Sequence, residues 1–312
     1  MDTPRIVFCG TPDYSVPYLD ALVHGGFTPI VVITQPDRAK GRSGTPTESP
    51  VKRYAMKADI PVLQPESVNT PEFVAEIAAL DPDLLVVVAF GQILKQDFLD
   101  VFPRGTINVH PSWLPRHRGA TPLQNTILAG DTETGVTIML MDAKMDHGPI
   151  LAQAPLTIST DETLLGLAQK TIAIGAPLLV NTLRTWLDGS IVPVEQDHEK
   201  ATFTKLLKKE DGKIDWNEAS FDIERKVRAL SPWPGVWTEM HGKRVKIFEI
   251  AHMPITVHET SRNPIQHGNV FVLGKELFVT CGDNTALSIK KLQPEGKNPM
   301  TAEEYINGMK GK

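Results

Sequence analysis

Short apolar runs, most of them closed by glycine, proline or a polar residue, recur through the first 160 residues. Their length and their content of Val, Ile and Leu predict strands that are buried on both faces. These strands are predicted over residues 5–10, 28–34, 83–90, 106–110, 136–141 and 150–156. Apolar residues at helical spacing predict helices over residues 16–23, 71–80, 122–129 and 161–187. Strands that alternate with helices are typical of an α/β fold with a doubly wound, mostly parallel, Rossmann-like sheet.

The pattern changes after about residue 200, where short strands separated by turn residues follow one helix near 221–230. The clearest of these strands are predicted over residues 243–250, 269–274, 277–282 and 286–293. Short strands at this spacing are typical of a small, OB-like β-barrel. We therefore expect a first domain over 1–190, a linker over 191–206 and a smaller barrel domain over 207–312.

The composition is that of a packed protein, with 41% hydrophobic and 22% charged residues among 312. No continuous apolar run approaches the ~20 residues that span a bilayer, and the first residues lack the pattern of a secretory signal. Cys9 and Cys281 are too few for a disulfide framework. We expect a cytoplasmic protein without a membrane partner.

Charge is distributed unevenly along the chain, whose formal net charge is −5. Residues 1–200 carry a net charge of −8 and residues 201–312 a net charge of +3. The overall charge disfavours general polyanion binding, but an anionic partner would meet the second half of the chain. Ordinary scatter of surface charge explains the asymmetry equally well.

The predicted strand 106–110 carries polar residues where a core strand should not. Ile107 and Val109 suit a core, whereas Asn108 and His110 share the opposite face near the carboxyl end of the strand. Ligands of open α/β sheets bind at that end. We therefore interpret Asn108 and His110 as candidate site residues, the alternative being a structural histidine in an ordinary core.

A turn with two acids follows the predicted strand 136–141. We expect this strand to end at the same edge as strand 106–110, which would bring Asp142 and Asp146 to the same crevice. An amide donor, an imidazole and a carboxylate together suit attack of an amine on an acyl carbon. Without a nucleophilic Ser or Cys nearby, direct transfer is more natural than a covalent acyl-enzyme. The histidines are not accompanied by further residues at metal-ligand spacing, so we predict no metal.

The segment from Asn108 to Gly119 reads N-x-H-x-S-x-L-P-x-x-R-G, and D-x-G begins at Asp146. With these residues the chain resembles the formyltransferase family that uses 10-formyltetrahydrofolate, and in particular its members that formylate initiator methionyl-tRNA. Other matching segments span residues 8–19, 34–52, 87–94, 121–142, 213–219, 231–240 and 292–308. The resemblance implies a two-domain enzyme of translation initiation, with residues 1–190 as the catalytic domain and 207–312 as an OB-like, tRNA-binding domain.

The resemblance also implies a role for each residue of the trio. Asn108 would polarise the formyl oxygen. His110 would stabilise the oxyanion and move the proton. Asp146 would partner His110 and help to deprotonate the attacking amine.

Binding residues for the two substrates follow from the same resemblance. The co-substrate 10-formyltetrahydrofolate would lie against Ser112, Trp113, Leu114 and Pro115. The basic loop over 35–50 would contact the initiator tRNA through Arg38 and Arg42, whose guanidinium groups suit phosphates and stacked bases. A solvated surface loop is the alternative for 35–50. We expect a monomer.

Other functions compete with this prediction. A formyltransferase that acts on an amino-sugar nucleotide or on glycinamide ribotide would keep the same catalytic trio. A dinucleotide-dependent dehydrogenase is disfavoured because G-x-G-x-x-G is missing after the first strand. A non-catalytic RNA-binding barrel is disfavoured by the trio. Trp233 and Trp237 suit base stacking, but we predict that both lie in a core.

Overall fold

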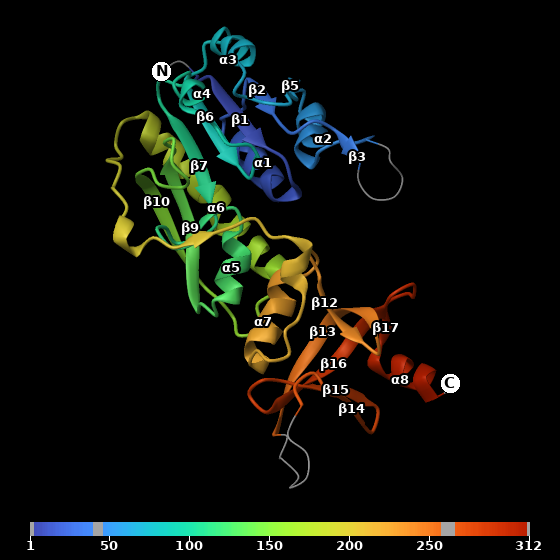
Figure 1. The fold of residues 1–312 in the computed structure, drawn as a ribbon. Helices are drawn as coiled ribbons and strands as arrows, with labels where there is room; N and C mark the ends of the chain where they lie inside the picture. Colours follow the sequence, from blue (N-terminus) through green and yellow to red (C-terminus); the bar gives the residue numbers. More distant parts are fainter. Residues whose placement is uncertain (1–2, 40–45, 257–265, 311–312) are drawn as a thin grey trace. The chain divides into compact units, whose positions relative to one another are not determined.

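A computed structural model describes residues 3–39, 46–256 and 266–310, which form two compact units (Figure 1). The first unit consists of Met1–Pro122, Glu133–Ile158 and Leu167–Thr204, and the second of Leu123–Thr132, Ser159–Gly166 and Lys205–Lys312. Most of the segment predicted to be a linker, residues 191–204, thus belongs to the first unit.

The first unit is built on a seven-stranded sheet with the strand order β10-β9-β7-β6-β1-β2-β5. Its strands are β1 (Ile6–Gly10), β2 (Val31–Ile33), β5 (Val62–Leu63), β6 (Leu84–Val88), β7 (Thr106–His110), β9 (Glu133–Leu140) and β10 (Ile150–Thr157). The five strands from β7 to β5 are parallel, whereas β9 is antiparallel to both β7 and β10. The predicted doubly wound, mostly parallel sheet is confirmed.

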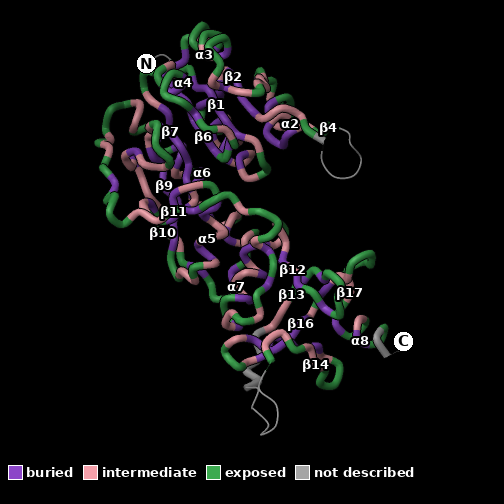
Figure 2. The backbone as a smooth tube through the Cα atoms, viewed as in Figure 1, coloured by how far each residue is buried: buried purple, intermediate pink, exposed green. Residues whose placement is uncertain are grey.

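Helices cover both faces of this sheet because its central strands are apolar on both sides. Every residue of β1, β6 and β7 is buried (Figure 2). The helices are α1 (Val16–His24), α2 (Pro50–Lys57), α3 (Pro71–Ala78), α4 (Gln96–Leu99) and α6 (Leu164–Leu187, all but its first three residues), with 3-10 turns at Asp13–Ser15 and His198–Lys200. One core cluster holds side chains of α1, α2 and α6, and a second holds those of α3 and α4.

Helix α6 is long and apolar enough to cross a membrane by length and composition alone, although charged and polar residues interrupt its apolar sequence. Its residues Leu179 and Leu183 are fully buried in the same cluster as Ile107 and Val109 of β7. We therefore interpret α6 as a core helix of the first unit.

Two pairs of short strands complete the first unit. Strands β3 (Arg38–Ala39) and β4 (Pro46–Thr47) are antiparallel, and β8 (Arg118–Gly119) pairs in parallel with β11 (Phe203–Thr204). The region predicted as a loop over 35–50 thus contains one strand pair, and the helix that starts at Pro50 was not predicted. Ser49 caps this helix, since its Oγ accepts a hydrogen bond from the Lys52 N–H at 3.0 Å.

The second unit contains an antiparallel, barrel-like sheet of six strands with helices beside it. Its elements are α5 (Pro122–Leu128, all but its first residue), a 3-10 turn at Lys209–Gly212, α7 (Ser220–Leu230), β12 (Val236–Met240), β13 (Lys243–Thr256), β14 (Val270–Leu273), β15 (Glu276–Thr280), β16 (Thr285–Pro294), β17 (Met300–Thr301) and α8 (Ala302–Lys310). The register of β13 against β16 shifts at several points, which lets this long strand bend. The predicted small barrel is confirmed.

The core prediction for the two tryptophans is wrong for Trp233, which is 52% exposed. Trp237 is half-buried on β12, and the Arg244 guanidinium carbon lies 3.9 Å from the centre of its ring. Arg244 and Lys246 follow Lys243 on β13, which pairs with β12. Trp237 therefore carries a cation on its face.

Candidate active site

Strand β7 presents Asn108 and His110 together. Ile107 and Val109 pack in one core cluster, so the alternating side chains of Asn108 and His110 point to the other face of the sheet. Asn108 is 9% exposed and His110 is 4% exposed. Two polar side chains at this depth require hydrogen-bond partners.

Asp146 reaches this face by a route that differs from the expected one. Strand β9 runs antiparallel to β7 and pairs Leu140 with Ile107, so β9 ends beside the start of β7. The expectation that both strands end at the same edge was wrong, because apolar periodicity does not reveal strand direction.

The loop after β9 instead folds back over the sheet. A Cβ atom on Gly148 would lie 2.1 Å from the Leu140 carbonyl oxygen, so the return needs a glycine. Asp146 itself has a φ of 47°, in the left-handed region. This turn brings the carboxylate of Asp146 back to Asn108 and His110.

The three predicted catalytic side chains meet at one carboxylate oxygen. Oδ1 of Asp146 lies 3.4 Å from Nδ2 of Asn108, which donates to it, and 3.7 Å from Nδ1 of His110. Oδ2 accepts a hydrogen bond from the backbone N–H of Gly119 at 2.7 Å. The carboxylate is thus held by the last residue of the N-x-H-x-S-x-L-P-x-x-R-G motif.

The hydrogen bonds of His110 determine its tautomer. Its Nε2 lies 3.0 Å from the carbonyl oxygen of His117, which can only accept. Nε2 must therefore carry a hydrogen, and the lone pair of a neutral His110 lies on Nδ1, which faces Asp146. A proton taken up by this imidazole arrives beside a carboxylate.

The predicted folate-binding segment is divided between buried and accessible residues. Ser112 is fully buried and its hydroxyl donates to the Arg116 carbonyl oxygen at 2.6 Å, while Leu114 is 1% exposed. Pro115 is half-buried and Trp113 is 42% exposed. Within this segment Trp113 offers the largest apolar surface to a ligand.

Asp142, the other acid in the loop, contacts a different partner. Its Oδ2 lies 2.7 Å from Nδ1 of His147, and the ring of His147 stacks on His198 at 4.0 Å between centroids. Asp142 therefore braces the loop beside Asp146 and lies outside the trio.

Two residues that were not predicted support the trio. Arg118 is 2% exposed and donates from Nε and Nη2 to Oε1 of Gln196, at 3.1 and 2.6 Å. Burial lowers the pKa of Arg118, while the carboxylates of Asp146 and Asp142 act in the opposite direction. The arginine of the motif was a visible signal for Arg118, but Gln196 lies in the predicted linker and had none.

Of the two residues predicted to bind tRNA, only Arg38 lies within the described residues. Its side chain is 67% exposed, and Nη2 lies 2.8 Å from Oε2 of Glu66. The preceding Asp37 accepts hydrogen bonds from Lys52 at 2.5 Å and from Gln64 at 2.8 Å. Arg42 lies outside the described residues.

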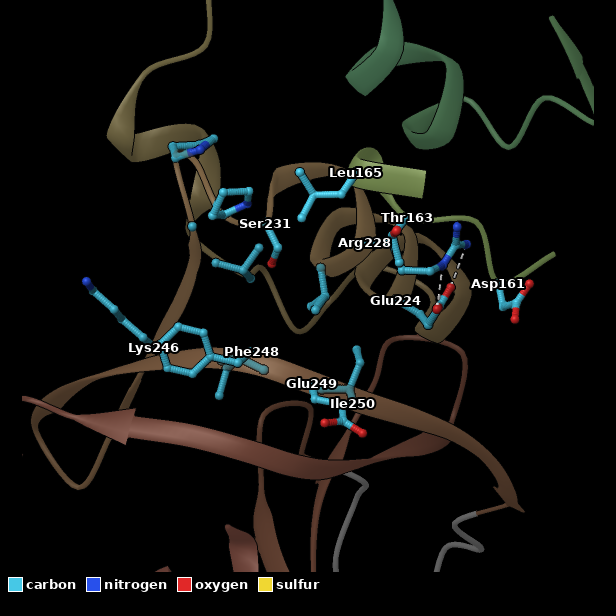
Figure 3. A pocket seen from close by; sticks show the side chains of 16 residues that line it. Asp161, Thr163, Leu165, Glu224, Arg228, Ser231, Lys246, Phe248, Glu249 and Ile250 are labelled. Atoms are coloured by element: carbon cyan, nitrogen blue, oxygen red, sulfur yellow. Dashed lines mark hydrogen bonds and ion pairs between the residues drawn. The ribbon is translucent and has the colours of Figure 1, made fainter. Parts of the chain in front are cut away.

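A cavity of about 640 Å³ lies in the second unit (Figure 3). Leu165, Phe248 and Ile250 contribute apolar walls, and an ion pair between Arg228 and Glu224 borders it at 2.6 Å. None of the predicted catalytic side chains lines this cavity. Across the part of the chain that the structure describes, no group of three His, Cys, Asp or Glu side chains is arranged to hold a metal.

Comparison with known families accounts for nearly the whole chain. Residues 4–183 match the family described as formyl transferase, and residues 206–310 match the formyl transferase C-terminal domain. The chain belongs to the formyl transferase family. The family membership predicted from the motif is thereby confirmed.

Individual family members extend the likeness along the chain. Proteins of Roseiflexus castenholzii and Geobacter sulfurreducens, both named methionyl-tRNA formyltransferase, are 43% and 42% identical over 98% of this chain, and the alignments cover 96% and 94% of those proteins. A relative of the same name from Chloroflexus aggregans is 43% identical over 98% of this chain and 97% of its own length.

Solved structures of more distant proteins share the fold. An N-formyltransferase from Helicobacter canadensis, in complex with folinic acid and dTDP-3-aminofucose, has a TM-score of 0.67 and 19% identity over 93% of this chain and 99% of that chain. HypX from Aquifex aeolicus, in complex with tetrahydrofolic acid, has a TM-score of 0.62 and 17% identity over 98% of this chain and 47% of that chain.

Proposed function

We propose that this formyl transferase moves the formyl group of 10-formyltetrahydrofolate to the amino group of initiator methionyl-tRNA. The observation that carries the proposal is the 43% identity, over 98% of the chain, to a relative named methionyl-tRNA formyltransferase. The similarity includes the C-terminal family domain, so it extends beyond the catalytic unit.

The site suits direct attack of an amine on the formyl carbon. A bond forms between the amino nitrogen and the formyl carbon, and negative charge develops on the formyl oxygen. The Asn108 amide carries two hydrogens, of which one is directed to Asp146. The other can donate to the oxyanion without any change of charge on the protein.

The attacking amine then loses a proton, which moves in two steps. The amino nitrogen becomes positive on attack and passes its proton to Nδ1 of His110, where the Asp146 carboxylate stabilises the imidazolium. As the bond between the formyl carbon and N10 of the folate breaks, the same proton passes to N10. The products are formylmethionyl-tRNA and tetrahydrofolate, and His110 returns to its neutral form.

The two substrates would meet different surfaces. In this proposal Ser112–Pro115 borders the folate, with Trp113 as the accessible apolar contact. Arg38, Arg42 and the barrel unit, whose segment 201–312 carries a net charge of +3, contact the tRNA. A monomer in the cytoplasm is sufficient for this reaction, and both properties remain predictions.

An acceptor competition tests the proposal. Purified protein and 10-formyltetrahydrofolate are incubated with charged initiator tRNA and with a dTDP-linked amino sugar, and formyl transfer to each is followed by mass spectrometry. We expect transfer to methionyl-tRNA and, at equal concentration, less than about 1% of that rate with the sugar, because a site built for one acceptor leaves polar groups unpaired with the other. Transfer to the sugar alone would overturn the assignment of the acceptor.

A further inference from the structure

Gln196 holds the loop that carries Asp146. Its Nε2 donates to the carbonyl oxygen of Asp146 at 3.0 Å and to that of Gly148 at 2.7 Å. These carbonyl groups lie on either side of His147. With 5% exposure, Gln196 makes these bonds away from competing water.

The opposite end of the same amide faces Arg118. Oε1 accepts from both Nε and Nη2 of the guanidinium, so both hydrogens and both lone pairs of the amide are used. The orientation of the amide is determined, because carbonyl groups only accept and a guanidinium only donates. A carboxylate at this position would satisfy Arg118 but would direct an oxygen at two carbonyl oxygens.

Arg118 is itself fixed to the first unit. Its backbone N–H donates to the Thr202 carbonyl oxygen at 2.8 Å, and its strand β8 pairs with β11. Nη2 also lies 2.8 Å from Nδ1 of His198. Gln196 therefore connects the loop that carries Asp146 to Arg118, a buried residue whose backbone is paired with β11.

The loop needs such a connection because of its own conformation. Asp146 adopts a φ of 47°, and residues 143–145 before it are exposed. A left-handed residue next to an exposed segment is maintained only when the surrounding bonds determine it. The two bonds from Gln196 set the backbone on either side of His147, and thereby the direction of the Asp146 carboxylate.

We infer that Gln196, oriented by Arg118, is a positioning residue that acts on the reaction through Asp146. This inference rests on the proposed function, in which Asp146 stabilises the protonated His110. It assigns a role in catalysis to a residue that need not touch either substrate.

The first test is Gln196→Glu, which keeps an acceptor for Arg118 and removes both donors to the loop. We expect kcat for formyl transfer to methionyl-tRNA to fall about 10- to 100-fold, with KM for both substrates within about twofold of wild type. Gln96→Glu on α4 is the matched control, because it also replaces a donor that faces an oxygen, Oδ1 of Asp100, with an acceptor, at a position outside the site. A kcat within about twofold of wild type would overturn the inference.

Gln196→Asn is the second variant, in case the first one does not fold. It keeps an amide on a side chain one methylene shorter, so it cannot reach both the arginine and the two carbonyl groups. We expect kcat to lie between that of wild type and that of Gln196→Glu, again with unchanged KM. Unchanged kcat in a folded Gln196→Asn protein would also contradict the inference.

A double-mutant cycle separates positioning from a general structural effect. If Gln196 acts through Asp146, adding Gln196→Glu to Asp146→Asn should lower the single-turnover rate by less than about twofold further. If the rate of the double variant instead falls by the product of the losses in the two single variants, the inference is overturned. Should wild type not formylate methionyl-tRNA at all, the proposed function fails instead, so the two failures are distinguishable.

Discussion

Charge is arranged in opposite ways in two regions of the molecule, the Asp146 cluster of the first unit and the Trp237 face of the second unit. We define the Asp146 cluster as Asn108, His110 and Asp146, and the Trp237 face as Trp237, Lys213 and Arg244. In the cluster Asn108 and His110 are buried and the Asp146 side chain is 14% exposed, and each of the three side chains has a hydrogen-bond or charged partner. On the Trp237 face, Lys213 and Arg244 are exposed beside the ring, with the Lys213 Nζ 5.4 Å from its centre.

This difference teaches what each region is able to do. Buried polar groups are costly to misplace, so the cluster holds one geometry, which suits the stabilisation of charge that develops at fixed atoms during the reaction. Exposed cations gain little from any single contact and are screened by salt, which suits a surface that holds a polyanion through many weak contacts. Substitutions in the cluster should therefore act on kcat, and those on the Trp237 face on KM.

The largest effect is expected for His110→Ala. Loss of the imidazole removes the group that takes the proton from the amine, so kcat should fall about 1,000-fold, with KM for tRNA nearly unchanged. Single-turnover transfer measures the change. His24→Ala, at a 75% exposed side chain on α1, is the control. Equal kcat in His110→Ala and His24→Ala would contradict the assignment of catalysis to the Asp146 cluster.

A smaller effect is expected for Gly119→Ala. The new Cβ would lie 2.3 Å from the Thr204 carbonyl oxygen at a φ of 111°, so the N–H that holds Asp146 must move. We expect a loss of about 2 kcal/mol in stability and about 10-fold in kcat. Gly26→Ala also has a positive φ, of 84°, but meets no atom within 4 Å, so it should lose stability alone. A normal kcat in Gly119→Ala would show that this hydrogen bond does not matter.

Arg244→Ala tests whether the Trp237 face acts on binding. We expect KM for methionyl-tRNA to rise about fivefold with unchanged kcat, and the slope of log affinity against log salt to decrease by about 1. Lys275→Ala is the control, because Lys275 is paired with Glu303 at 2.7 Å. A change in kcat alone would contradict a binding role for the Trp237 face.

The smallest effect is expected for Asp283→Asn, which concerns stability only. Asp283 accepts hydrogen bonds from the backbone N–H and hydroxyl of Ser220, at the start of α7. Burial acts to raise the pKa of Asp283, but hydrogen bonds from Thr285 and Ser220 outweigh it and lower the pKa to about 2.

Because the folded pKa of Asp283 lies below its unfolded value of about 3.9, the carboxylate stabilises the fold above about pH 4 and loses this effect as pH falls towards 2. The side chain is exposed, so we expect only about 1 kcal/mol. Amide exchange of α7 in the full chain should accelerate about fivefold in Asp283→Asn at pH 6 and not at pH 2. An equal difference at both pH values would contradict this account.

Much of the fold could be predicted because its strands are short apolar runs with clear ends. The direction of β9 could not, since apolar periodicity is the same for parallel and antiparallel neighbours. The helix at Pro50 was missed because three of its eight residues are basic and a segment rich in Gly, Pro and Ser precedes it. Trp233 was assigned to a core from its size, but it stands between two prolines and is exposed.

The candidate site was predictable only where its residues lie in recognisable patterns. Asn108 and His110 interrupt an apolar strand, and Asp146 follows at the spacing of the family motif. Gln196 gave no such signal, because its role depends on a carbonyl group and a guanidinium that approach it only after folding.

The most direct measurement is the single-turnover rate of formyl transfer from 10-formyltetrahydrofolate to charged initiator tRNA, for wild type and for Asn108→Ala. The account holds that wild type transfers the formyl group and that the variant does so about 100-fold more slowly, because it has lost the donor to the developing oxyanion. Failure of wild type to formylate methionyl-tRNA, or an equal rate in the variant, would contradict it.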